Sequence, residues 1–227
     1  MQRVDVYLEI GGRKTFACAV HWPGWSRAGR TEGDALQALA ACGTRYAAVV
    51  GRVAPPFEAP DDAGGLTIVE RVAGGAGTDF GVPGATPAAD LRPLDAAELE
   101  RLRDILRAAW AAFDDAARDA VGVELRKGPR GGGRDLDRIV DHVREAEDAY
   151  VMQLGARPAA RAGALPADWL ERARSDVLDA LTARAIGRPV ANPRQTRNPW
   201  LPRYFVRRAT WHLLDHAWEI QDRTAPG

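Results

Sequence analysis

Apolar and polar residues alternate near the start of the chain, and this alternation gives way to a helical period within the first fifty residues. The alternating segments are Val4–Ile10 and 15–20, and Gly11-Gly12 between them is typical of a hairpin turn. Residues 31–48 then place Leu and Ala at helical spacing, with Thr31 positioned as the N-cap. The pattern therefore predicts a short antiparallel sheet covered by one helix, which we assign to a module of residues 1–60.

Residues 61–93 are rich in Gly, Pro and Ala, and only 66–72 has the composition of a strand. Glycine and proline interrupt longer elements, so this region is predicted to be a connector with one added strand. The glycine-rich stretch from Gly74 to Gly84 lacks the Gly-Lys-Ser/Thr ending of a phosphate-binding loop. A nucleotide site is therefore not expected there.

From residue 94 to 227 the apolar positions recur every three or four residues. Four helices are predicted, at 96–120, 135–154, 166–186 and 200–223. Long connections between four such helices are typical of an antiparallel four-helix bundle, whose core commonly holds metal and ligand sites. The whole chain is thus predicted to be an α+β protein, with the sheet-and-helix module preceding an all-α bundle.

The charge balance and the composition limit the kinds of partner that the chain is expected to bind. Lys plus Arg equals Asp plus Glu at 31 each, so no global field draws the chain of 227 residues to nucleic acid or to an anionic membrane. No apolar run is long enough to span a bilayer, and no secretory signal opens the sequence. Cys18 and Cys42 are far apart in apolar segments, which favours reduced thiols and a cytoplasmic location.

The fourth predicted helix carries His212 and His216, which are four residues apart and therefore share one face. His142 lies at the edge of the apolar stripe of the second helix and is the natural third ligand. His21 belongs to the N-terminal module and is expected to be a turn or interface residue. Three neutral imidazoles with an open position suit Zn first, and Ni, Fe or Mn are also permitted. The alternative is a set of core histidines hydrogen-bonded to Asp141, Asp215, Glu219 and water.

Two further groups of residues are candidates for the chemistry. Glu145 and Glu219 each lie one turn from a histidine and are candidates for orienting an imidazole or moving a proton. A solvated salt bridge is the commoner fate of such glutamates. In the loop RKGPRGGGR, the residues Lys127, Arg130 and Arg134 are candidates for binding a carboxylate or phosphate, although a solvated linker is the simpler interpretation.

Residues 95–223 resemble the DinB-like four-helix bundle superfamily, which includes thiol S-transferases that use bacillithiol or mycothiol and mycothiol-dependent maleylpyruvate isomerases. The resemblance rests on the helix order, on His142, and on the run Trp211-His212-Leu213-Leu214-Asp215-His216. It implies a divalent metal on His142, His212 and His216, and a low-molecular-weight thiol that attacks a small electrophile. It also implies a homodimer, because members of this superfamily are often dimers.

Residues 4–48 resemble, more distantly, the HicB antitoxin type of domain, through the order of elements and the turn Trp22-Pro23-Gly24-Trp25. Two functional hypotheses follow. In the first, the protein is a metal-dependent enzyme of the thiol S-transferase or isomerase type. In the second, it is a non-catalytic binding protein, whose N-terminal module recognises a protein or nucleic-acid partner while the bundle serves as a scaffold.

Overall fold

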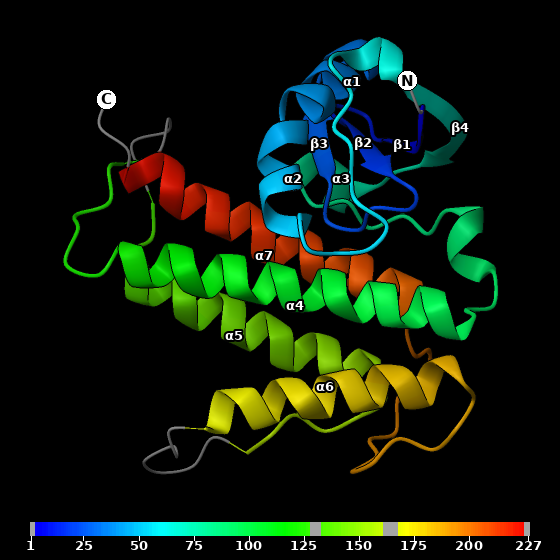
Figure 1. Cartoon of the computed structure of the whole chain (residues 1–227), viewed down its shortest axis with the longest axis vertical. Coiled ribbons are helices and arrows are strands. Elements are labelled where there is room, and N and C mark those ends of the chain that lie inside the picture. The colour runs from blue at the N-terminus through cyan, green and yellow to red at the C-terminus, as the bar shows by residue number, and fades with distance from the viewer. Residues whose placement is uncertain (1–2, 128–132, 161–167, 225–227) are drawn as a thin grey trace.

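The computed structural model describes residues 3–127, 133–160 and 168–224. It is a mixed α/β structure in which a four-stranded sheet at the N-terminus is followed by helices (Figure 1). The strands are β1 (Val4–Ile10), β2 (Thr15–Ala19), β3 (Ser26–Gly29) and β4 (Leu66–Ala73), in the order β3-β2-β1-β4. No helix of the described ranges is both long and apolar enough to cross a membrane.

The sheet is mixed, so the prediction of an antiparallel sheet was wrong in part. β1 pairs antiparallel with β2, with Tyr7 opposite Cys18, and β2 pairs antiparallel with β3. β4, however, runs parallel to β1. Parallel neighbours need a long crossover connection, and the helices between β3 and β4 provide it.

Two helices occupy the place of the single helix expected at 31–48. They are α1 (Glu32–Ala41) and α2 (Gly43–Val50), which meet at Cys42. Thr31 caps α1 as expected, because its hydroxyl accepts from Asp34 N while the Asp34 carboxylate accepts from Thr31 N. A Cβ on Gly43 would lie 3.0 Å from the Cβ of Ala59, so a larger residue there would require the following segment to shift by a few tenths of an ångström.

Both faces of the sheet are covered. Val6, Leu8 and Ala17 lie on the face that packs under α1. On the other face, Phe16 meets the edge of Trp211 at a ring-centroid distance of 6.3 Å. Trp211 belongs to α7 (Pro202–Thr224), so the sheet lies between α1 and α7.

One short element, η1 (Ala63–Gly65), precedes β4, and the remaining elements follow the sheet along the chain. They are α3 (Ala76–Phe80), η2 (Ala88–Leu91), α4 (Ala96–Asp119), α5 (Leu136–Gln153) and α6 (Trp169–Ala185), then α7. α4 and α7 pack along each other and run in the same direction, whereas α5 runs the opposite way (Figure 1). α6 lies farthest from the sheet and begins at Trp169, and the side chain of the preceding Asp168 makes no capping hydrogen bond.

α7 is the central element of the molecule. The turn at Gly24 fits against it, since a Cβ there would lie 3.1 Å from both Thr210 and Leu214. The core is continuous from the sheet through α4 to α7. The N-terminal module and the helices therefore share one hydrophobic core, although the sequence suggested two modules with a connector.

Glu9 joins α3 and the segment that follows it to the sheet. Its buried carboxylate accepts hydrogen bonds from the Thr78 hydroxyl at 2.5 Å, from Gly84 N at 2.9 Å and from Ala85 N at 2.8 Å. Backbone carbonyls of this segment in turn accept hydrogen bonds from α7. The segment is thus fixed between β1 and α7.

Candidate metal centre

Three histidines from two helices meet at one point. His212 and His216 project from α7, and His142 projects from α5. The Nε2 atoms of His142 and His212 are 3.2 Å apart, and one ring nitrogen from each of the three residues lies within 4.8 Å of the others. The arrangement places the three imidazoles close enough to bind one metal ion.

The spacing of one pair of nitrogens, those of His142 and His212, fits a tetrahedral metal. A Zn–N distance of about 2.0–2.1 Å places two ligand nitrogens about 3.4 Å apart, close to the observed His142–His212 separation. The same separation also suits an N–H···N hydrogen bond between two neutral rings, as the structural alternative requires. Either arrangement needs an unprotonated nitrogen at the point of contact.

Burial keeps these nitrogens unprotonated. The pKa of His212 is lowered to about 2, first by burial and then by the charges of His216 and His142. Burial also lowers the pKa of His142, with a further contribution from Arg134. Both side chains are therefore neutral at pH 7, which is the form that binds a metal.

Glu219 fixes the orientation of His216. The Nδ1–H of His216 donates to Glu219 Oε2 at 2.8 Å, because an ionised carboxylate accepts only. This hydrogen bond is the largest cause of the lowered pKa of Glu219. The other oxygen of Glu219 accepts from Arg223 at 2.9 Å. This leaves Nε2 of His216 available to bind a ligand. Glu219 thus orients the imidazole, as carboxylates beside metal-bound histidines commonly do, and does not itself contact that ligand.

The second predicted glutamate, Glu145, has a different environment from Glu219. Glu145 is exposed on α5, one turn after His142. Its charge raises the pKa of His142, against the larger lowering effect of burial, so the carboxylate is near the cluster. Within the described residues it makes no direct hydrogen bond to any of the three histidines.

The predicted basic loop is described only in part. Lys127 and Arg134 are exposed, and Arg130 lies outside the described residues. The positive charge of Arg134 lowers the pKa of both His142 and His212, which places its guanidinium near the cluster. The start of the loop is anchored to α7, since Arg223 Nε donates to the Arg126 carbonyl at 2.7 Å and Arg126 N donates to the Arg223 carbonyl.

Arg208, which the sequence pattern did not single out, lies one turn before His212 on α7. Its guanidinium donates to the Tyr150 hydroxyl at 3.1 Å and to the Pro83 carbonyl at 2.9 Å. Its spacing of four residues from His212 was a signal available in the sequence. The contacts with Tyr150 and Pro83 were not, because they join three distant segments.

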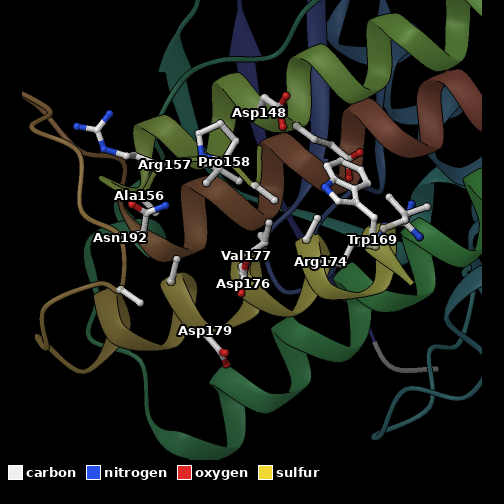
Figure 2. Close-up of a pocket in the computed structure, with 17 residues that line it drawn as sticks. Asp148, Ala156, Arg157, Pro158, Trp169, Arg174, Asp176, Val177, Asp179 and Asn192 are labelled. Atoms are coloured by element: carbon white, nitrogen blue, oxygen red, sulfur yellow. The ribbon is translucent and has the colours of Figure 1, made fainter. Parts of the chain in front are cut away.

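A separate pocket lies between α5 and α6 (Figure 2). Its volume is about 140 Å³, below the several hundred Å³ of most ligand sites. Val151 lines it nine residues after His142, which is half a turn round the helix, so the pocket is on the other side of α5 from the histidines. The labelled residues that line it are Asp148, Ala156, Arg157, Pro158, Trp169, Arg174, Asp176, Val177, Asp179 and Asn192. None of the predicted site residues that the structure describes lines it.

No family model matches the chain, and neither a curated protein nor a solved structure matches it. What this protein does is therefore argued from the histidine cluster and its surroundings.

Proposed function

We propose that His142, His212 and His216 hold a divalent cation, with zinc the first candidate. The observation that carries the proposal is the convergence of three imidazoles, two of them held neutral by burial. No fourth Cys, His, Asp or Glu of the described ranges joins the cluster. Catalytic zinc sites commonly use three protein ligands, whereas structural sites use four.

The activity we propose is that of a metal-dependent enzyme of the thiol S-transferase or isomerase type, acting on a small electrophile. A divalent cation supplies Lewis acidity, which favours the thiolate form of a small thiol at neutral pH. Mycothiol and bacillithiol are the thiols that the DinB-like resemblance implies, and α4 to α7 correspond in this proposal to its four-helix bundle.

The residues around the histidines have separate tasks in this proposal. Glu219 holds the His216 ring in the orientation that directs Nε2 to the cluster. Arg134 places a positive charge beside the histidines, and such a charge favours a thiolate over a thiol. Glu145, exposed beside His142, is positioned to exchange protons with solvent.

Elemental analysis of untagged protein, purified without chelator, tests the metal. We expect about one equivalent of a transition metal in the wild type and none in a folded His142→Ala, His212→Ala double variant. His21→Ala is the matched control and should retain the metal, because His21 is not part of the cluster. A wild-type protein that stays metal-free after incubation with zinc and with nickel would contradict the proposal.

The same preparations test the chemistry. Consumption of small thiols in the presence of a panel of electrophiles should require the metal and should be lost in the double variant. If metal is bound but no thiol is consumed, the second hypothesis is favoured, in which the chain is a non-catalytic binding protein. Both faces of the N-terminal sheet are covered, so the edge strands β3 and β4 and the outer surface of α1 are the places where a partner of that module could bind.

A further inference from the structure

Arg208 differs from the other arginines that are buried or partly buried along α7. Arg203 pairs with Glu98, Arg207 with Asp90, and Arg223 with Glu219. Arg208, in contrast, forms no ion pair with any carboxylate of the described residues, and both its hydrogen bonds go to neutral oxygens. A partly buried cation without a counter-ion is suited to bind an anion from outside the chain.

The contacts of Arg208 hold its guanidinium in place. It lies over the rings of Tyr150 and Trp211, at 5.6 and 5.1 Å from their centroids. The Tyr150 hydroxyl and the Pro83 carbonyl each accept one hydrogen bond. A guanidinium carries five N–H donors, so three remain for a ligand, and a carboxylate matches their fork geometry.

Arg208 lies near the histidine cluster on the same helix. It precedes His212 by four residues on the same helical face, a distance of about 6 Å along the axis. Tyr150 links the two, since its ring also lies 5.8 Å from that of His212. A small molecule that places a carboxylate on Arg208 can therefore reach the histidine cluster with its other end.

Aromatic rings surround this position and indicate the shape of the ligand. Tyr150 lies 5.2 Å from Trp200, and Trp200 lies 4.9 Å from Tyr204, between ring centroids. All three side chains are partly exposed, unlike the aromatic residues of the core. Such rings favour a flat, apolar body beside the charged group.

We propose that Arg208, with Tyr150, binds the carboxylate of a small, flat molecule next to the histidine cluster. The inference rests on the proposed function in one respect, namely that this carboxylate compound is the one acted on at the histidines. Arg208 is assigned here as a binding residue, and Arg134 of the predicted basic loop supplies a second positive charge near the cluster.

Ligand-observed ¹⁹F NMR tests this assignment with 4-fluorobenzoate and its neutral counterpart 4-fluorobenzamide. Each is titrated against metal-free and zinc-incubated protein. Because a charge-assisted hydrogen bond is worth about tenfold or more in affinity, we expect wild-type protein to bind the acid about tenfold more tightly than the amide. Arg208→Gln should abolish this preference, and Arg208→Lys should keep part of it.

Arg107→Gln is the matched control, because Arg107 is an exposed arginine on α4 that pairs with Asp104. It should bind both probes as the wild type does. Should Arg208→Gln lose its near-UV circular dichroism, Tyr150→Phe replaces it, since loss of the hydroxyl frees the guanidinium and should reduce the preference several-fold. Equal binding of acid and amide by wild-type protein would overturn the inference, as would a folded Arg208→Gln that keeps the preference.

The outcomes separate this inference from the metal proposal. A protein without metal that still prefers the acid retains the carboxylate site and loses the proposed enzyme chemistry. A protein that binds metal but does not distinguish the probes retains the metal centre and loses the assignment of Arg208.

Discussion

His212 contacts both of the other imidazoles of the cluster and is only 8% exposed. A proton on this ring would bring a charge into an apolar setting beside two more histidines, which explains why its pKa falls to about 2. At the residue scale, burial therefore keeps the His212 imidazole neutral, which is the form that can bind a metal ion. The same burial makes the fold sensitive to acid.

We expect the free energy of unfolding of the metal-free protein to decrease as the pH falls below about 6.5. In that range the unfolded chain protonates His212 and the folded chain does not, so each pH unit costs up to about 1.4 kcal/mol. Above pH 6.5 the residue is neutral in both states and contributes no pH dependence. Urea denaturation at pH 5, 6, 7 and 8 measures the slope, and a His212→Gln variant with the same slope as wild type would contradict this explanation.

The histidine spacing was readable from the sequence because positions four apart on a helix share a face. Glu219 was found by the same rule, although its contact with His216 through Nδ1 needed the structure. Arg208 was not predicted from the sequence, because its position is set by hydrogen bonds to Tyr150 and Pro83, which lie far from it in sequence. Local periodicity carries no information about such contacts.

At the scale of elements, α7 is held against its neighbours by buried ion pairs as well as by apolar packing. Arg207 is the clearest case, because it donates to both oxygens of Asp90 and also to the Ala19 carbonyl of β2. Asp90 has a fully buried side chain in η2. One arginine thus joins three elements at the boundary between sheet and helices.

Replacing Asp90 by Ala should lower the free energy of unfolding by about 3–5 kcal/mol, because it leaves the Arg207 charge buried without a partner. The double variant Asp90→Ala, Arg207→Met should recover part of this loss, although the Ala19 carbonyl then lacks its donor. Urea denaturation of the wild type and the two variants provides the comparison. A double variant less stable than Asp90→Ala alone would show that the buried charge is not the cause.

Helix α7 and the Thr31 cap of α1 were predictable, since their signals are local. The strand β3 and the parallel pairing of β4 were not, because a four-residue strand has no clear period and pairing depends on distant partners. Asp90 reads in the sequence as an ordinary loop residue. Only the tertiary contact with Arg207 explains its burial.

At the scale of the whole molecule, the glycine- and proline-rich composition of 61–93 suggested a connector between two modules. The structure instead contains one core that includes Leu8 and Trp25 from the first part and Leu106 and Leu214 from the second. The composition of a segment indicates how flexible it is. It does not indicate whether the parts of the chain on either side of that segment pack against each other.

A fragment of residues 94–227 should therefore fail to form a stable native structure. Removing the sheet exposes Trp211, Trp218 and Leu214, which the full chain keeps less than 5% exposed. We expect the fragment to bind a hydrophobic dye and to lack a cooperative thermal transition, whereas the full chain unfolds in one transition. A fragment that melts cooperatively, with dispersed amide NMR signals, would show that the helices fold independently.

His142 and His212 are 70 residues apart in sequence, which sets the order in which the centre is assembled. Bringing such distant positions together costs loop-closure entropy that only the folded core offsets. The unfolded chain can present His212 and His216 as a neighbouring pair, but not the third nitrogen. The three nitrogens therefore come together only in the folded chain, and a cation of the kind proposed would find its complete set of ligands only there.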